Sequence, residues 1–551
     1  MRTIRLLLFV LCLFPWFAQG ADPIPHSNWS FRQVGLTPTL SGGRLKPFDS
    51  FARETVLFET GSRKFEKWDP VDLIFSWIAF PTYWESRPWI RISRDDVRRQ
   101  LGLDEVRTVY SPEELLKNSS LVQYADQIER KDPGSLPPGA SKNNPREQEL
   151  KGVLEKISLF HGLITGQSWL LIPKALPEGW GSLLEHNPQA LPIQKHFIQL
   201  LKAYQTGDQG EFESVSQLLR HQVEGAVPGF DAHTRHVLEA ENLYHRMRPF
   251  LMAWVFYLVS AVAWGLSAVL KNKRALKATV RFAYATSALA VLSHIVGFAL
   301  RCFIAGRPPV TNMYESVVWV SLGVVVFAWI LYGLQRQTIL LCVAHFLACF
   351  GLVAGDAAPA ILDPSINPLV PVLRSNYWLT VHVLTITLGY AAFALTFGLA
   401  NVALFQIARR AAKQKILAVN QLTYRAMQFG VVFIAAGTIL GGIWADYSWG
   451  RFWGWDPKEV WALITLLCYL VILHGRYTSW MGQFGFAVGS AVSFMSVVMA
   501  WYGVNFILGV GLHSYGFSTG GTPWVLGFVA IELAYVAATA LVHYRRTPAR
   551  G

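Results

Sequence analysis

Charged residues and cysteines are scarce in this chain of 551 residues. Charged residues make up 15% of the chain and hydrophobic residues 52%, with a mean hydropathy of +0.30, which disfavours a wholly soluble protein. The five cysteines are Cys12, Cys302, Cys342, Cys349 and Cys468. None lies in the polar region 21–248, so we predict no structural disulfide there. The pattern Cys-x-x-Cys-His does not occur in the sequence either, so the chain is not itself a c-type cytochrome.

Residues 1–20 have the layout of a secretory signal peptide. Two arginines precede an apolar run over residues 6–17, and small residues follow it. An uncleaved anchor helix is the alternative, because Trp16 and Phe17 are bulky for a cleavage region. Both interpretations place the residues that follow outside the membrane.

The rest of the chain divides into a mixed region and an apolar region. Residues 21–248 contain long polar stretches and predict an exported, mainly helical soluble domain. In residues 249–551, apolar runs long enough to cross a bilayer follow one another closely. We predict nine spans, at 249–270, 282–304, 317–334, 338–355, 377–408, 427–444, 460–474, 486–508 and 523–543. The predicted fold class is an all-α polytopic membrane protein with an N-terminal exported domain.

The net charge of +13 is better explained by membrane orientation than by nucleic acid. The basic residues gather beside apolar spans, so we predict no nucleic-acid partner. Clusters in 271–281, 409–415 and 545–550 are expected to face the cytoplasm. Counting spans back from these clusters places 21–248 outside, in agreement with the signal peptide. The same count assigns four loops to the outer face: 305–316, 356–376, 445–459 and 509–522.

The loop 444–459, with the sequence WADYSWGRFWGWDPKE, is the most unusual stretch. Aromatic residues are ordinary at a membrane interface, and Pro457 is suited to begin the next helix. Gly450 and Gly454, interleaved with the tryptophans, favour instead a surface that a flat ligand can approach closely. The loop by itself leaves both interpretations open.

Histidines in the apolar region support the ligand interpretation. Of the fourteen in the chain, six lie there: His294, His345, His382, His474, His513 and His543. An ionisable residue within a span is a candidate functional residue by default, although a single one can simply be hydrogen-bonded between helices. His382, near the outer end of its span, and His513, in an outer loop, flank the tryptophan loop. Two imidazoles on opposite faces of a macrocycle commonly hold haem iron.

The other histidines of this region lie deeper. His474 follows Pro457 by 17 residues, or about 26 Å of helix, which places it toward the inner side of the bilayer. His294 and His345 are further candidates for haem ligation. For both, packing or hydrogen bonding between helices is the simpler alternative.

With these residues in view, the apolar region resembles the CcsA/ResC family of system II cytochrome c biogenesis. The tryptophan-rich signature W-G-x-x-W-x-W-D-P-K-E is filled by Trp449, Gly450, Trp453, Trp455, Asp456, Pro457, Lys458 and Glu459. Further matches are GRPPVTNMYE at 306–315, WLTVHV at 378–383 and GLHSY at 511–515. The resemblance covers about 285–542, and the D-P-K-E ending favours CcsA over the related CcmC and CcmF families.

The resemblance implies a cytochrome c synthase component that binds haem b. Haem would be presented on the outer face for thioether attachment to the Cys-x-x-Cys-His motif of an apocytochrome c, which needs a thiol-reducing system. His382 and His513 would be the axial ligands of this outer haem iron, and the loop 449–459 would cradle it. His474 would be one ligand of a haem within the membrane.

The resemblance also implies a partner and a location. A separate CcsB/ResB-like membrane protein is expected, because we do not find that half in this sequence. The location would be the bacterial inner membrane, with the 21–248 domain and the tryptophan loop on the periplasmic side. The segment GGRLKPFDSFAR at 42–53 resembles a region just ahead of the CcsA part in some fused proteins.

Three cations of the outer face are candidates to pair with haem propionates: Arg307, Arg451 and Lys458. Anchoring at the membrane interface is the alternative for each. Two other functions stay open. One is a haem exporter or transporter without bond-forming chemistry, in which the histidines line a pathway. The other is an electron-transfer subunit with two b-type haems. The tryptophan loop between the two outer histidines favours the synthase.

Overall fold

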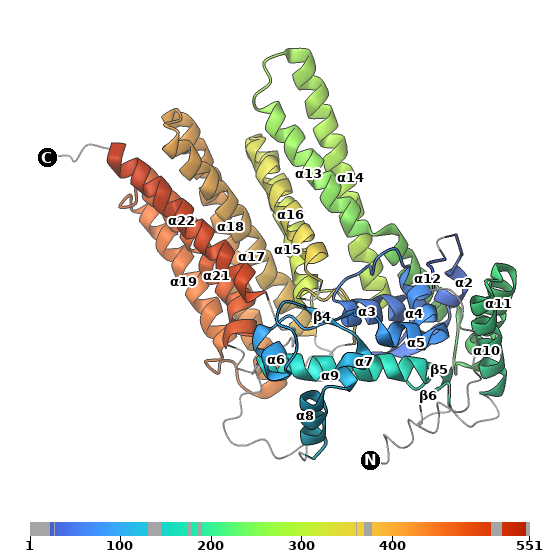
Figure 1. Ribbon diagram of the computed structural model, residues 1–551. Coiled ribbons are helices and arrows are strands. Elements are labelled where there is room, and N and C mark those ends of the chain that lie inside the picture. Colours follow the sequence, from blue (N-terminus) through green and yellow to red (C-terminus); the bar gives the residue numbers. More distant parts are fainter. Residues whose placement is uncertain are drawn as a thin grey trace. The chain divides into compact units, whose positions relative to one another are not determined.

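The computed structural model describes residues 23–26, 28–130, 145–173, 179–184, 190–359, 361–368, 377–508 and 521–546. The chain forms two compact units, Met1–Arg246 and Met247–Gly551, and each is described by itself (Figure 1). Both consist mainly of helices, which confirms the predicted fold class. The predicted signal peptide and His513 lie outside the described residues.

The first unit combines helices with three two-stranded antiparallel sheets among its described residues. The strands are β1 (Pro38–Ser41), β2 (Arg44–Pro47), β3 (Ile90–Arg91), β4 (Val109–Tyr110), β5 (Leu170–Pro173) and β6 (Trp180–Ser182). The helices are α2 (Arg32–Gly35), α3 (Phe48–Thr60), α4 (Pro70–Ala79), α5 (Pro81–Ser86), α6 (Asp95–Gln100), α7 (Pro112–Leu116), α8 (Ser119–Arg130), α9 (Pro145–Ile164), α10 (Leu191–Thr206), α11 (Gln209–Ala226) and α12 (Ala232–Met247). The core is rich in aromatic pairs, such as Trp77 stacked on Trp89 at 5.1 Å.

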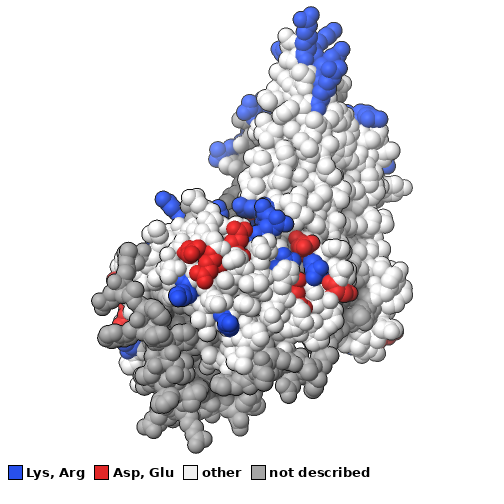
Figure 2. Space-filling view, turned by 90° about the vertical axis from the view of Figure 1, so that its right-hand side faces the viewer, with Lys and Arg blue, Asp and Glu red and all other residues white. Residues whose placement is uncertain are grey.

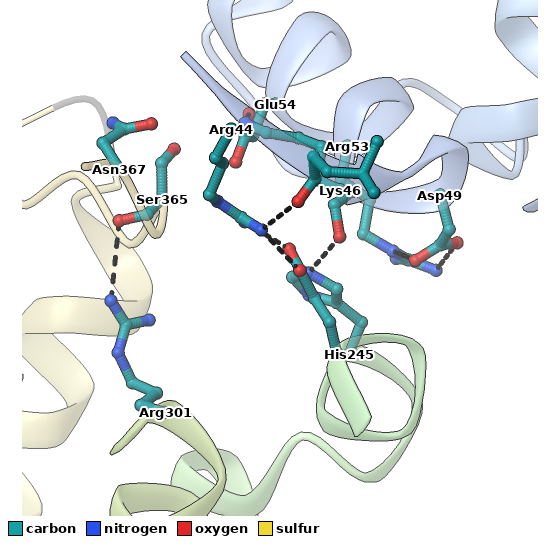
Figure 3. A network of polar contacts seen from close by, with 12 residues as sticks. Arg44, Lys46, Asp49, Arg53, Glu54, His245, Arg301, Ser365 and Asn367 are labelled. Carbon is teal, nitrogen blue, oxygen red and sulfur yellow. Dashed lines mark hydrogen bonds and ion pairs between the residues drawn. The ribbon is translucent and has the colours of Figure 1, made fainter. Parts of the chain in front are cut away.

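The segment 42–53 forms the β1–β2 turn, β2 and the start of α3. Gly42 and Gly43 both have positive φ, as a two-residue hairpin turn requires. The charged residues that follow are used in ion pairs. The Arg44 guanidinium donates two hydrogen bonds, of 2.5 and 2.7 Å, to the Glu241 carboxylate, and Lys46 pairs with Glu54 at 2.5 Å (Figure 3). These contacts give the segment a structural role within the first unit.

The second unit is a bundle of long apolar helices. They are α13 (Pro249–Ser267), α14 (Lys273–Ala305), α15 (Met313–Gln335), α16 (Ile339–Ala357), α17 (Tyr377–Ala408), α18 (Lys413–Trp449), α19 (Pro457–Tyr477), α20 (Gln483–Val492), α21 (Phe494–Val498), the π-helix η2 (Met499–Leu508) and α22 (Thr522–Arg546). With α20 to η2 taken as one continuous segment, the described residues contain nine helices long and apolar enough to cross a membrane. This number confirms the prediction from hydropathy.

Two of these helices extend well beyond the predicted apolar spans. α14 begins at Lys273, where the Asn272 side chain accepts hydrogen bonds from the first free N–H groups, and α18 begins at Lys413. The predicted spans began at 282 and 427. Hydropathy locates the apolar part of a helix, whereas the helix itself continues through polar residues until a cap ends it.

Glycines bring α17 and α18 into close contact. A Cβ at Gly389 of α17 would lie 2.9 Å from the Ile434 backbone nitrogen, and a Cβ at Gly437 of α18 would lie 2.6 Å from the Ile386 Cα. Small residues at such positions let two membrane helices approach backbone to backbone. This close approach places the residues of α18 directly beside the N-terminal half of α17.

The two ends of the second unit differ in charge. The ends at the α13–α14 and α17–α18 turns carry the basic clusters in 271–281 and 409–415. Figure 2 shows Lys and Arg without Asp or Glu at the upper tip, where Figure 1 places the α13–α14 turn. The acidic residues of 249–551 are Glu315, Asp356, Asp363, Asp446, Asp456, Glu459 and Glu532. All but Glu532 lie at or beside the opposite helix ends.

Candidate functional site

A cavity of about 530 Å³ opens at the acidic end of the second unit, among α15, α17, α18, α19 and η2. Its size lies within the range of roughly 300–1,000 Å³ that is usual for small-molecule and cofactor sites. Three segments that the sequence singled out contribute to its walls: the loop 306–315, the start of α17 with His382, and the tryptophan loop. They are far apart in the sequence, so the fold brings them together.

His382 lines the cavity from α17. Its Nδ1 donates a hydrogen bond of 2.7 Å to the Gly437 carbonyl oxygen of α18. A carbonyl oxygen only accepts, so Nδ1 carries the proton and Nε2 has the lone pair that metal ligation needs. The Trp444 indole lies nearly parallel to the imidazole, at 4° and a centroid distance of 6.3 Å. The ring is therefore fixed in tautomer and orientation.

The aromatic residues of the tryptophan loop divide into two groups. Trp453 and Phe452 line the cavity, and Trp449 packs edge-on against Trp444 at 4.7 Å. Trp455 is 72% exposed and stands perpendicular to Trp453 at 5.9 Å. Its φ of 57° is rare for a bulky residue and indicates a backbone held under strain. The loop thus presents one aromatic ring outward beside a cavity lined with others.

The D-P-K-E part of the loop begins a helix. Pro457 is the first residue of α19, which confirms that expectation, and Asp456 is its N-cap. The Asp456 carboxylate accepts a hydrogen bond of 3.0 Å from the Lys458 backbone N–H. The Glu459 carboxylate accepts from the backbone N–H of Asp456 at 3.1 Å and of Gly454 at 2.8 Å. This capping box fixes the end of the tryptophan loop, so helix initiation and ligand binding are compatible roles for the same motif.

Glu315 holds the loop 306–315 in place from the start of α15. Its side chain is fully buried and pairs with Arg301, also buried, at 2.8 Å. The second carboxylate oxygen accepts hydrogen bonds from the Thr311 backbone N–H and hydroxyl, both at 2.9 Å. Arg301 also donates to the Pro364 carbonyl oxygen at 2.8 Å, and Figure 3 shows it turned toward the loop that carries Ser365. The ion pair of Glu315 and Arg301 thus ties the loop 306–315 and the loop that carries Pro364 to α14.

The three candidate propionate partners differ in position. Arg307 and Lys458 both line the cavity. Arg307 donates to the Asn367 carbonyl oxygen at 2.8 Å and lies 3.5 Å from Glu315. Arg451 contacts Glu459 at 3.6 Å and lies over the Trp449 ring at 5.5 Å. Arg307 and Lys458 are therefore the cations placed for a ligand in the cavity.

Two deeper histidines lie in the buried core of the second unit. The His294 Nε2 donates to the Val318 carbonyl oxygen at 3.0 Å, and its Nδ1 accepts from the Tyr257 hydroxyl at 3.2 Å. His345 donates from Nδ1 to the Leu341 carbonyl oxygen. Since both ring nitrogens of His294 have partners, its geometry favours the alternative of a hydrogen-bonded core residue.

His474 has a different environment, on the exposed face of α19. Its Nδ1 donates to the Leu470 carbonyl oxygen at 2.8 Å, so its Nε2 also keeps the lone pair. The imidazole is therefore accessible from outside the bundle rather than from the cavity.

Among the residues of the site that were not predicted from the sequence are Gly437, Gly441, Trp501 and Asn505. Gly441, Trp501 and Asn505 line the cavity. The glycines at 430, 437 and 441 follow a helical spacing of seven and four, a signal of one close-packed face. Trp501 and Asn505 come from the π-helix, whose position beside the cavity has no signal in the local sequence.

Comparison with known proteins identifies the family. The family described as Cytochrome C assembly protein matches residues 310–513, which include most of the cavity wall. The cytochrome c biogenesis protein CcsA of Guillardia theta is 31% identical over 287 residues, which cover 47% of this chain and 92% of that protein. The chain belongs to the CcsA family. The CcsA of Prochlorococcus marinus strain NATL1A is 32% identical over 272 residues, covering 43% of this chain and 84% of that protein.

One relative matches both units of this CcsA-family protein. Protein NrfI of Wolinella succinogenes is 27% identical over 503 residues, which cover 86% of this chain and 53% of NrfI. The chain thus spans about half the length of NrfI. Among solved structures, a cytochrome c haem lyase CcmF has a TM-score of 0.36 and 16% identity, covering 55% of this chain and 51% of that chain.

Proposed function

We propose that this CcsA-family protein holds haem b in the cavity and presents it for thioether attachment to the Cys-x-x-Cys-His motif of an apocytochrome c. The observation that carries the proposal is the meeting of His382, the tryptophan loop and the loop 306–315 around one cavity. Each segment supplies one feature of a haem site: an axial ligand, an aromatic surface and a cation.

The chemistry of the cavity fits haem. His382 offers an oriented Nε2 to the iron, and its Nδ1–H bond to Gly437 raises the basicity of the ligand. Trp453 and Phe452 offer apolar surfaces to the macrocycle, while Arg307 and Lys458 can pair with the propionates. His513, predicted as the opposite axial ligand, lies outside the described residues. With two histidine ligands the iron would be six-coordinate while haem waits.

In this proposal the residues of the chain bind and orient, and bond formation takes place at the edge of the site. When bound, haem supplies two vinyl groups, and each cysteine S–H of the apocytochrome adds across one of them without a leaving group. The reaction requires reduced thiols and therefore a thiol-reducing system. Trp455, 72% exposed, stands where an incoming peptide would meet the site.

Charge and exposure support the proposed orientation and partner. By the positive-inside rule the basic end of the bundle would face the cytoplasm, and the cavity would then lie on the periplasmic side of a bacterial inner membrane. His474 lies on the exposed face of α19. It can therefore share a haem within the membrane with a histidine of a CcsB/ResB-like partner.

Optical spectroscopy of the full chain in mild detergent tests the proposal. We expect a reduced low-spin b-type spectrum that weakens when His382 and His513 are both replaced by alanine, because the haem at the cavity is then lost. His543→Ala, on α22, is the matched control and should keep the spectrum. A protein that carries no haem, even with a CcsB/ResB-like partner co-expressed, would refute the haem site.

A second measurement separates the synthase from its rivals. In cells that lack this protein, holocytochrome c should disappear while apocytochrome is still exported. Normal holocytochrome levels would favour an electron-transfer subunit. If haem added outside the cell restored attachment in these cells, an exporter would be favoured.

A further inference from the structure

We infer that Gly441 of α18 is a positioning residue for the iron ligand: its bare backbone, with the Gly437 carbonyl one turn earlier, forms a slot that sets the orientation and the hydrogen bonding of the His382 imidazole. This inference rests on the proposed haem site. It assigns a role in that site to residues of α18, whereas the proposed ligand His382 comes from α17.

The imidazole of His382 lies directly against the backbone of α18 at Gly441. A Cβ at this position would lie 2.6 Å from Cε1, 2.8 Å from Nδ1 and 3.2 Å from Nε2 of the ring. Two contacts under 3 Å and a third of 3.2 Å, all with atoms of one rigid ring, cannot be relieved by a small side-chain rotation. Even alanine would therefore push the imidazole away from α18.

Displacing the ring would break the bond that fixes its tautomer. The Nδ1 to Gly437 oxygen distance is 2.7 Å, so a shift of about 1 Å takes it beyond hydrogen-bonding distance. Trp444, parallel to the ring at 6.3 Å, lies one turn beyond Gly441 on the same helix. Gly437, Gly441 and Trp444 thus orient a ligand that comes from α17.

The expected consequence is electronic as well as steric. An Nδ1–H bond to a carbonyl increases the electron donation of the imidazole to the iron and stabilises the ferric state. Loss of this bond should raise the reduction potential of the haem, and a displaced Nε2 should weaken low-spin ligation. A tenfold loss of preference for the ferric form corresponds to a rise of about 59 mV.

A matched control separates positioning from helix packing. Gly430 lies on the same helix, and a Cβ there would lie 2.3 Å from the Phe393 ring of α17. The crowding is comparable, but it falls 11 residues earlier in α18, or about 16 Å along the axis. Gly430→Ala should therefore disturb the α17–α18 interface without contact to the ligand.

The experiment measures the low-spin spectrum and the haem midpoint potential of the full chain in detergent. Gly441→Ala should lose low-spin haem and raise the potential of the remainder, while Gly430→Ala and Gly333→Ala, whose Cβ meets nothing within 4 Å, keep the wild-type values. If Gly441→Ala does not accumulate, Trp444→Ala replaces it. This variant frees the ring without adding volume and should also raise the potential.

The outcomes distinguish the two proposals. A wild-type protein without haem would refute the proposed function and this inference with it. Wild-type haem that depends on His382, with an unchanged spectrum and potential in Gly441→Ala, would overturn the inference alone. An equal change in Gly430→Ala would also overturn it, since general loosening of the interface would then explain the effect.

Discussion

Replacing Glu315 with glutamine should lower the stability of the fold far more than the loss of one exposed charge would. The side chain is fully buried, and so is its ion-pair partner Arg301. Glutamine keeps the size of the side chain but leaves a guanidinium charge without its buried counter-ion. The damage should reach the cavity, because the same carboxylate holds Thr311, which lines it.

The magnitude follows from the burial of both partners. Removing one member of a buried ion pair costs about 3–5 kcal/mol, because the other charge stays desolvated. An unfolding entropy of roughly 2.1 cal/mol/K per residue, applied to residues 247–551 as one cooperative unit, converts this loss into a fall of about 5–8 °C in the melting temperature.

The assay is the thermal stability of the full chain in detergent, with haem content measured on the same samples. Asp446→Asn, at an exposed carboxylate, is the control and should leave the melting temperature unchanged. Arg301→Met combined with Glu315→Gln should recover at least half of the loss, since the stranded charge is gone. If Glu315→Gln has the melting temperature of the wild type, the ion pair does not hold the loops 306–315 and 361–368 together.

Three further predictions concern the tryptophan loop and the first unit. Trp455→Gly should relieve a left-handed backbone strain of about 1–3 kcal/mol. The melting temperature should therefore stay the same or rise, while haem attachment to the apocytochrome falls. A fall in both would show that the Trp455 ring serves packing instead. Asp456→Ala should remove the N-cap of α19, which costs about 1 kcal/mol of stability. Haem should then dissociate faster, as measured by stopped-flow transfer to an acceptor. An unchanged dissociation rate would show that the tryptophan loop does not help to retain haem. Burial raises the pKa of Glu59 well above its ordinary value, against the opposing effect of Lys156. The folded state therefore binds the proton more tightly than the unfolded state, and stability is lost as pH rises from the ordinary toward the raised pKa. Glu59→Gln should remove this loss, as measured by the melting temperature between about pH 5 and pH 8. If the melting temperatures of the wild type and of Glu59→Gln changed with pH in the same way, the raised pKa of Glu59 would be contradicted.

The hydropathy of the sequence was sufficient to predict the bundle, while the helix limits needed the structure. Nine apolar runs became nine candidate spans because the length of an apolar run is a local property of the chain. The start of α14 at Lys273 instead depends on the Asn272 cap. The first unit was predicted only as mainly helical. The β3–β4 and β5–β6 pairs join residues that local patterns do not connect, whereas the β1–β2 hairpin has a local signal at Gly42 and Gly43 that the prediction did not use.

The sequence by itself determined which segments are candidates for the functional site: the tryptophan loop, the His382 segment and the loop 306–315, each recognisable from residue types at fixed spacing. Only the tertiary structure decided what each side chain touches. The bond from His382 to Gly437, the bare backbone at Gly441 and the pairing of Arg301 with Glu315 all depend on how separate helices pack. Such contacts join residues 14 to 59 positions apart, and their geometry is fixed by the bundle as a whole rather than by any local stretch of sequence.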